Sequence, residues 1–561
     1  MGRYVRWQIA IALLGIISLS ALLAYSAYSF TNVLVPDQGG TFREGVAGSA
    51  RYINPLLCQY NEVDQDLCSL VFRGLTRLDE HGRVVPDLAD GPPRVSPDGL
   101  TYTFRLRPGL SWQDGVPITA DDVIFTVHLM QDPNFPGVPF LGELWRTVEV
   151  TKLDDLTVRF TLRQPFTPFL DYTTIGLLPA HLWASIPAEQ LSRTQLNLQP
   201  VGNGPFLVSE VSADHIRLEP NPRYDGPSPY LAAVEFRFYP DYPSLFEAFV
   251  RGEIEGISRV IPQDLARAEA REDLQLFSAP LSGYVIILFN LRNPNVPFLQ
   301  DKAVRQALMY ALDRQQLIDE VLAGQGIVAH SPIMPYNWAY NPDVRRYTQN
   351  VERARRLLDE AGYVDGDGDG IREKDGRPLR WILLSDDDPE RQRLAQAISQ
   401  AWRAIGVEAI PQAVSFTGLI SDFIFPHEFE SAIVSWELAG DPDPYPLWHS
   451  TQAKEGGQNY GGWSNPRADE LMEEARSITD VEKRKALYRE FQDIFAEELP
   501  GLLLYYPVYT YGVSDKVHGV EIGPLNTPSD RFRTIAQWYM VTRRITIPEA
   551  RASRSAVSPL P

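Results

Sequence analysis

The sequence predicts an α/β fold that is divided into two or three lobes. Residues 102–106, 157–162 and 234–239 alternate apolar and polar side chains like half-buried strands, and segments of helical period lie between and after them. Strands interleaved with helices are typical of α/β bodies. The 561 residues exceed what one hydrophobic core normally serves, and 44% hydrophobic with 22% charged residues is the composition of a folded protein.

The first half of the chain supplies a helix, a strand–turn–helix unit and a glycine-rich turn. The first helix covers residues 63–72 and ends before Gly74. The helix of the unit opens at Thr119, whose partner in a capping box is Asp122. In residues 201–206, VGNGPF, two glycines precede a proline, so we expect the backbone to turn sharply there and to cross between lobes.

The second half continues the alternation of strands and helices. One long amphipathic helix is expected at residues 301–323. The tyrosine-rich run at residues 502–513 predicts a strand that returns to an earlier lobe, and the tail from residue 547 is rich in proline and serine, which predicts disorder. Further expected elements are a buried strand at residues 283–292, helices ending at Gly362 and Gly406, a strand at residues 379–384 and a helix that opens with a capping box at residues 479–482.

The N-terminus carries an export signal. Arg3 and Arg6 precede an apolar run at residues 9–25, which predicts that the bulk of the chain leaves the cytosol. The run is intermediate in length between a signal-peptide core and a membrane span. We favour an uncleaved membrane anchor, and cleavage near residues 24–26 with release stays open as the alternative.

Charge and cysteines narrow the class of protein. The formal net charge is −20 and is dispersed, which argues against nucleic acid and against anionic lipid as partners. The only cysteines, Cys58 and Cys68, are separated by nine residues, a spacing that fits one local disulfide in an exported protein or two separate buried thiols.

Catalytic and nucleotide-binding motifs are absent from the sequence. It has no Gly-x-Ser-x-Gly, no phosphate loop ending in Gly-Lys-Ser/Thr, no His-Glu-x-x-His and no Cys-x-x-Cys. We therefore predict a protein that is not an enzyme and holds no organic cofactor, and an exported hydrolase is the weakest alternative.

One stretch copies the beginning of a calcium-binding loop. The oxygen ligands alternate along the chain, with glycine at the sixth position, but the closing glutamate is missing because the twelfth position is Gly376. The alternative is an Asp-Gly hairpin before the strand at residue 379. The candidate calcium ligands are Asp365, Asp367, Asp369, Ile371 through its carbonyl, and Glu373.

The most unusual stretch is SWELAGDPDPYPLWHSTQAKEGGQNYGGWSNP at residues 435–466. Its tryptophans, tyrosines and acidic residues in an irregular backbone are typical of a binding surface. A long loop whose tryptophans only pack onto the domain beneath it fits the composition equally well.

Several stretches together resemble the extracytoplasmic solute-binding proteins of ABC importers, in family 5, which includes oligopeptide-, dipeptide- and nickel-binding proteins. The resemblance covers residues 40–538 in the family's order. The matching stretches are FRLRPGLSWQDGVPITADDVIFT at residues 104–126, VGNGPF at 201–206, FNLRNP at 289–294, DKAVRQALMYALDRQQLI at 301–318, ARRLLDEAGY at 354–363 and NYGGWSNPRADELMEEA at 459–475.

The resemblance implies a two-lobed fold of the periplasmic-binding-protein type, class II, with an inserted region and a hinge of crossing strands. The ligand would be held between the lobes. The implied division is 1–39 as signal or anchor and linker, 40–75 with 200–289 and 504–546 as lobe I, 76–199 as the inserted region of lobe I, 290–503 as lobe II and 547–561 as a disordered tail.

The resemblance also implies the function. Such proteins capture a solute outside the cytoplasmic membrane and deliver it to an ABC-transporter permease, and an oligopeptide is the favoured ligand. A monomer is expected, at the extracytoplasmic face of the membrane. Two alternatives stay open: an oligosaccharide ligand, for which the aromatic loop offers stacking faces, and an anchored sensory or scaffolding protein without a transport role.

The expected site lies in the loop at residues 435–466. In peptide-binding members, an aspartate a few positions after the loop tryptophan pairs with the amino terminus of the peptide. Here Glu437 follows Trp436 and Asp441 comes later than the pattern requires, whereas Asp443 with its proline does match. The candidate ligand-binding residues are Tyr60, Asn61, Trp436, Glu437, Asp441, Asp443, Tyr445, Asn459 and Trp463.

Overall fold

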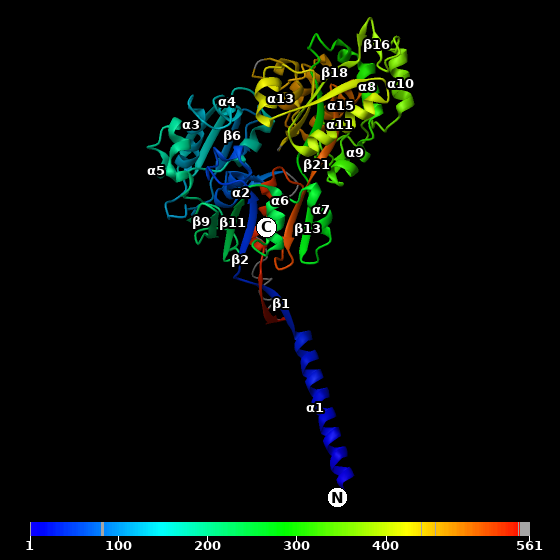
Figure 1. Ribbon diagram of the computed structural model, residues 1–561. Helices are drawn as coiled ribbons and strands as arrows, with labels where there is room; N and C mark the ends of the chain where they lie inside the picture. Colours follow the sequence, from blue (N-terminus) through cyan, green and yellow to red (C-terminus); the bar gives the residue numbers. More distant parts are fainter. Residues whose placement is uncertain (1, 80–82, 439, 455, 548, 550–561) are drawn as a thin grey trace.

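The computed structural model describes residues 2–79, 83–438, 440–454, 456–547 and 549, and it shows two lobes with a long helix, α1 (Arg3–Thr31), standing apart from both (Figure 1). Lobe I is the body that holds strands β2 and β9 to β13, and lobe II is the body that holds β14 and β18 to β20. The predicted α/β class and the two lobes are confirmed. The boundaries predicted for the lobes stay predictions, and nearly all of the predicted tail lies outside the described residues.

One sheet runs through both lobes. Its strand order is β19-β18-β20-β14-β21-β12-β2-β11-β10-β9, and β13 and β15 pair with β21 beside this path. The strands are β2 (Thr41–Ala47), β9 (Phe206–Val211), β10 (His215–Pro220), β11 (Ala233–Tyr239), β12 (Gly256–Ile257), β13 (Leu274–Pro280), β14 (Gly283–Phe289), β15 (Gly326–Val328), β18 (Arg380–Asp386), β19 (Glu408–Val414), β20 (Ser431–Glu437) and β21 (Gly501–Ser514).

Strand β14 is buried along its whole length. Its odd-numbered residues pack into a core with α8 to α11, and its even-numbered residues pack into a second core with α14 and α15. A strand covered on both faces has a continuous apolar sequence, as this one does. The helices of lobe II are α8 (Lys302–Ala311), α9 (Arg314–Leu322), α10 (Val351–Glu360), α11 (Pro389–Arg403), α12 (Phe416–Gly418), α13 (Tyr445–Trp448), α14 (Pro466–Ser477) and α15 (Val481–Glu498).

The single helix predicted at residues 301–323 is wrong, because α8 ends at Ala311 and α9 begins at Arg314. Asp313 between them is the N-cap of α9, and its carboxylate accepts a hydrogen bond from the Gln316 N–H at 3.0 Å. An aspartate that satisfies the free N–H groups of a new first turn favours a helix start over continuation. The apolar positions fit one helix, but the cap divides it.

Strand β21 crosses between the lobes. Its residues 501–505 pair with β14 of lobe II, and its residues 508–514 pair with β13 of lobe I. The predicted returning strand is therefore confirmed. β14, which the predicted division assigned to lobe I, also pairs with β20. A second crossing is the short link at residues 281–282, between β13 and β14.

The glycine-rich turn at residues 201–206 does not cross between the lobes, so that prediction is wrong. It packs within lobe I against α2 (Glu62–Val71), where a Cβ at Gly202 would lie 2.1 Å from the carbonyl oxygen of Val71. Glycine is required there because two backbones approach closely. The other helices against the sheet of lobe I are α6 (Tyr242–Val250) and α7 (Pro262–Glu269).

Residues 76–199 build a separate antiparallel sheet, β5-β6-β8-β7, beside lobe I. The predicted capping box is confirmed: the Asp122 carboxylate accepts a hydrogen bond from the Thr119 N–H at 2.9 Å. The elements here are β3 (Thr76–Leu78), β4 (Val84–Pro86), β5 (Arg94–Val95), β6 (Thr101–Arg105), β7 (Val148–Asp154), β8 (Thr157–Leu162), α3 (Ala120–Gln131), α4 (Pro139–Trp145), the 3-10 turn η2 (Thr167–Thr174) and α5 (Ala180–Trp183).

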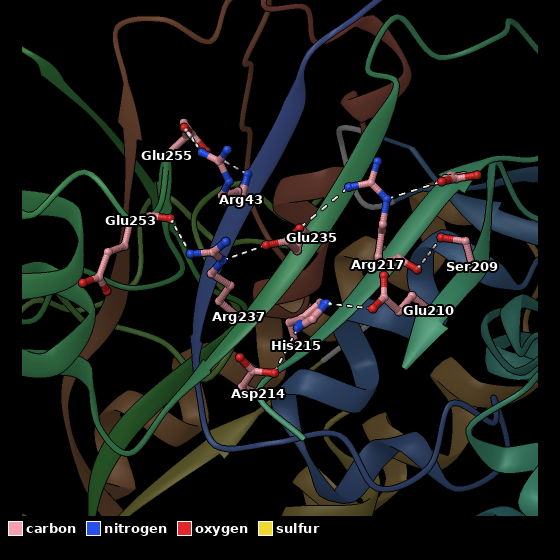
Figure 2. Close-up of polar contacts among 11 residues, drawn as sticks. Arg43, Ser209, Glu210, Asp214, His215, Arg217, Glu235, Arg237, Glu253 and Glu255 are labelled. Carbon is pink, nitrogen blue, oxygen red and sulfur yellow. Dashed lines mark hydrogen bonds and ion pairs between the residues drawn. The ribbon is translucent and has the colours of Figure 1, made fainter. Parts of the chain in front are cut away.

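Ion pairs cross the strands on one face of the lobe I sheet (Figure 2). Glu235 on β11 pairs with Arg237 of the same strand at 2.7 Å and with Arg217 of β10 at 3.7 Å. Arg43 on β2 pairs with Glu255 at 2.9 Å. Such half-exposed pairs contribute about 0–1 kcal/mol each, so their main effect is to keep this face polar and hydrated.

The N-terminal helix leads into a two-stranded ribbon. After α1, β1 (Asn32–Asp37) pairs antiparallel with β22 (Val541–Thr546) beneath lobe I, and α1 leads away from this ribbon and from both lobes (Figure 1). Within the described part of the chain, no helix is both long and apolar enough to cross a membrane.

A buried ionic cluster joins four segments of lobe I. The guanidinium of Arg531, whose side chain is 1% exposed, lies 3.0 Å from Glu44 on β2 and 2.7 Å from Asp66 on α2. The Tyr511 hydroxyl, on β21, donates to Glu44 at 2.8 Å. Burial raises the pKa of Glu44 to about 7, although Arg531 and Tyr511 act in the opposite direction.

The Glu44 carboxyl is expected to make the stability of lobe I depend on pH. The folded protein keeps this proton up to about pH 7, whereas the unfolded chain releases it above about pH 4.5. The contribution of Glu44 to stability is therefore fully present below about pH 4.5 and is lost as the pH rises through about 7. Relative to Glu44→Gln, the free energy of unfolding of the wild type should fall by about 3 kcal/mol across this window.

Urea denaturation at pH 4.5, 6 and 8 measures this difference. The control is Glu269→Gln, at the exposed end of α7, which should track the wild type at every pH. A constant difference between the wild type and Glu44→Gln would show that Glu44 is ionised in the folded protein throughout the range.

Candidate functional site

A cavity of about 1170 Å³ lies between the two lobes. Lobe I contributes Gln59 and Tyr60 near the start of α2, together with residues of η2. Lobe II contributes the end of β20, the loop that follows it and the turn around α12. Pockets for small molecules usually have about 300–1000 Å³, so this one is large enough for an extended ligand.

Aromatic rings from the loop after β20 form one wall of the cavity. The Trp436 ring stacks on Trp448 with centroids 6.4 Å apart and lies 6.0 Å from the ring of Tyr460. Trp448 is buried, and its indole N–H donates to the Tyr284 hydroxyl at 3.1 Å. The composition of the loop at residues 435–466 fitted either a binding surface or packing onto the domain, and the loop does both. Trp448 packs into the core, and Trp436 and Tyr460 line the cavity.

A π-helical turn forms the outer rim of the cavity. The turn, η6 (Leu419–Ile424), continues directly from α12, and Phe416 and Phe425 at its two ends are 62% and 57% exposed. Tyr60, from the opposite lobe, is 61% exposed. The π-helix is rare and occurs frequently at functional sites.

Three aspartates meet where the lobes touch. The backbone N–H of Asp441 in lobe II donates to the Asp171 carboxylate of η2 at 3.1 Å. Asp441 also pairs with Arg484 of α15 at 2.8 Å, and Asp443 pairs with Arg476 of α14 at 2.9 Å. The loop is thus held by two arginines from its own lobe and by one hydrogen bond from the other lobe.

Burial raises the pKa of several carboxyls in this region. It raises the pKa of Asp171 to about 7, and the nearby Asp441 charge adds to the shift. It raises the pKa of Asp443 to about 6, against the attraction of Arg476. The pKa of Glu437 is also raised by burial, and to a smaller extent by the charge of Glu62.

Five of the nine residues predicted for ligand binding line the cavity. They are Tyr60, Trp436, Glu437, Asp441 and Asp443. Ligand contact by these residues stays a prediction, because the geometry shows only that they face the space.

The other four predicted residues do not line the cavity. Asn61 caps α2, where its side-chain oxygen accepts from the Val63 N–H at 3.0 Å. The ring of Tyr445 stacks on the ring of His449, with centroids 4.0 Å apart. Asn459 and Trp463 are buried, and the Asn459 amide donates to the Trp463 carbonyl at 2.8 Å.

Sequence reasoning missed the contributions of η2 and of the π-helical turn. Asp171, Phe416 and Phe425 line the cavity but lie outside the loop at residues 435–466. The one sequence signal for the rim was the pair of phenylalanines flanking an apolar helical turn with no obvious core partner.

Comparison with known proteins identifies the family. The family profile for bacterial extracellular solute-binding proteins, family 5 Middle, matches residues 83–458. The chain belongs to this family. The expectation of an extracytoplasmic solute receptor with a two-lobed α/β fold is therefore confirmed.

Known relatives span nearly the whole of this family 5 protein. The oligopeptide-binding protein AppA of Bacillus subtilis is 31% identical, covering 90% of this chain and 92% of AppA. The dipeptide-binding protein of Escherichia coli is 29% identical, and the match covers 79% of this chain and 84% of that protein. The solved structure of AppA from Bacillus subtilis in complex with a nonapeptide has a TM-score of 0.73 and 29% identity, and the match covers 90% of this chain and 100% of the AppA chain. The structure of NikZ from Campylobacter jejuni in complex with Ni(L-His) has a TM-score of 0.75 and 26% identity, and the match covers 89% of this chain and 99% of the NikZ chain.

The two cysteines of this family 5 protein are free thiols in the structure. Both are buried, and the Sγ atoms of Cys58 and Cys68 donate to the carbonyl oxygens of Pro55 and Tyr52, at 3.8 and 3.9 Å. The two thiols lie against each other, so a disulfide between Cys58 and Cys68 stays a prediction.

The acidic loop before β18 brings three of the predicted calcium ligands together. Oxygen atoms of Asp365, Asp367 and Glu373 lie within 4.8 Å of one another. The Asp369 carboxylate instead accepts a hydrogen bond from the Ile371 N–H at 2.7 Å, and its other oxygen lies 3.8 Å from the Arg380 guanidinium. The remaining carboxylates also accept backbone N–H groups of the loop, so the turn is stable as a hairpin, and calcium binding stays a prediction.

Gly440 offers a test of the contact between the lobes. It has a φ of +77°, and a Cβ there would lie 2.4 Å from a carboxylate oxygen of Asp171. Gly440→Ala is therefore expected to push η2 away and hold the lobes apart, which small-angle X-ray scattering measures as a larger radius of gyration.

The matched control is Gly456→Ala. Gly456 has a φ of +78° with no atom within 4 Å of the added Cβ, so it carries the same backbone strain, about 1–2 kcal/mol, without the clash. An increase in both variants, or in neither, would contradict a specific effect of the Asp171 contact.

Proposed function

We propose that this family 5 protein captures an oligopeptide between its two lobes and delivers it to the permease of an ABC importer. The observation that carries the proposal is the 1170 Å³ cavity, whose walls come from both lobes and include the backbone of a sheet strand. The names of the relatives, oligopeptide-binding and dipeptide-binding proteins, support the same ligand class. Action as a monomer outside the cytoplasmic membrane is part of the proposal.

Strand β20 presents an unpaired backbone edge to the cavity. It pairs with β18 only at its first two residues, and residues 434–437 beyond them line the cavity. Toward β14, the Leu438 N–H donates to the Ser282 carbonyl, so the alternation of an antiparallel ladder turns the backbone groups of Ser435 and Glu437 away from β14. An extended peptide can add to such an edge as a further strand.

Binding of a mixed peptide library should raise the melting temperature and change the tryptophan fluorescence, because Trp436 lines the cavity. A ligand at 100 times its Kd adds about 2.7 kcal/mol of stability. A panel of oligosaccharides, measured in the same way, is expected to have no effect. A response to the glycans alone would favour an oligosaccharide receptor, and a response to neither would refute the peptide proposal.

The free edge of β20 can be tested at a single N–H. Ser435→Pro removes the backbone donor that faces the cavity while leaving the ladder to β14 bonded, and is expected to weaken peptide affinity about tenfold, the value of one lost hydrogen bond with an unsatisfied partner. Ser435→Ala, which keeps the N–H, is the control and should bind like the wild type in isothermal titration calorimetry. Equal affinity of the proline variant would argue against strand addition at this position.

A further inference from the structure

The cavity is lined by four acidic residues and by no basic one. Among the described residues around it, Asp171, Glu437, Asp441 and Asp443 are acidic, and there is no lysine, arginine or histidine. A ligand that fills this space therefore meets carboxylates and no cation. This sets a condition on the charge of the ligand.

Two arginines beside the cavity wall are already used by these carboxylates, and a further one, Arg391, donates to the hydroxyls of Ser435 and Tyr505. Arg484, with its side chain 3% exposed, binds Asp441 at 2.8 Å, the Tyr488 hydroxyl at 3.0 Å and the Ala475 carbonyl at 2.8 Å. Its donors are therefore occupied, and a ligand carboxylate cannot replace these partners without leaving other buried groups unpaired.

The second arginine is held in the same way. Arg476 binds Asp443 at 2.9 Å and lies over the rings of Tyr445 and Phe166 at 4.1 and 4.9 Å. Arg259, whose positive charge acts on Glu437, also faces Glu62 and the Tyr242 ring, which lies 5.7 Å away. These three arginines do not neutralise the four cavity acids and Glu62 together.

The uncharged part of the wall is aromatic and open to solvent. Outside α1, only three aromatic side chains in the described chain are more than a third exposed, and all three, Tyr60, Phe416 and Phe425, line this cavity. Exposed aromatic faces gain free energy by covering apolar groups and attract cations placed over the ring.

We infer that the cavity selects oligopeptides with apolar side chains and a net positive charge, and that it admits no free carboxylate. The carboxyl end of a bound peptide must then lie outside the cavity, which disfavours short zwitterionic peptides that would be enclosed completely. The inference rests on the proposed function, because it specifies the peptide that the cleft accepts. Asp441 and Asp443 are paired with arginines, so the cost comes from Asp171 and Glu437: desolvating a ligand carboxylate beside these two acids carries a large free-energy cost.

Three sets of hexapeptides test the inference. The sets share length and phenylalanine content and carry lysine, glutamine or glutamate at the same two inner positions, and isothermal titration calorimetry measures their Kd. The lysine set is expected to bind at least about tenfold more tightly than the glutamate set, with glutamine between them, and the difference should shrink at high salt. Amidation of the carboxyl end should leave hexapeptide affinity unchanged and improve that of dipeptides.

The double variant Asp171→Asn, Glu437→Gln replaces two cavity carboxyls by amides with little change in shape, and the titrations are run at pH 8, above the pKa of about 7 of Asp171. It is expected to reduce the preference for lysine over glutamate about tenfold, whereas Glu210→Gln, outside the cavity, should keep the wild-type preference. Equal binding of the three sets would overturn the charge selection and leave the proposed function standing. Binding of none of them, with or without amidation, would overturn the proposed function and the inference with it.

Discussion

The two lobes depend on one continuous strand. Because β21 is paired with β14 at one end and with β13 at the other, neither lobe can complete its sheet without the other. β14 in turn holds β20 in register, and β20 ends where the lobes meet. The loop that carries Trp436 and Asp441 therefore starts at a fixed point beside the cleft, and a rigid sheet positions residues that no regular element holds.

Charge is arranged in layers at this point. Arg476 and Arg484 lie behind the loop and satisfy Asp443 and Asp441, which keeps otherwise isolated buried charges paired. The layer that faces the cavity is left with carboxylates, aromatic rings and backbone groups. Burial of these carboxyls within the wall strengthens their effect on a ligand, and the aromatic rim supplies contact area that does not depend on side-chain identity.

Local patterns identified most of the elements correctly. The strands at residues 157–162 and 234–239 and the capping box of Thr119 and Asp122 were predictable because their signals lie within a few residues. The errors arose where one signal had two meanings. Gly202 was needed for close packing on α2 and not for a crossing, and Asp313 interrupted a helix whose apolar pattern was continuous. For the site, the loop after β20 was predictable from its composition, whereas Asp171 was not, because 270 residues separate it from the N–H it binds.

The sequence by itself determined the family, the α/β class and the loop that lines the cavity, since motifs and periodicity are local and can be read without coordinates. Only the tertiary structure decided which side chains of that loop enter the cavity, where Trp436 faces the space while Trp463 and Asn459 are buried behind it. It also decided the electrostatic character of the cleft. Whether a carboxylate is neutralised depends on which arginine packs against it, and the pairs of Asp441 with Arg484 and Asp443 with Arg476 form only when α14 and α15 fold against the loop.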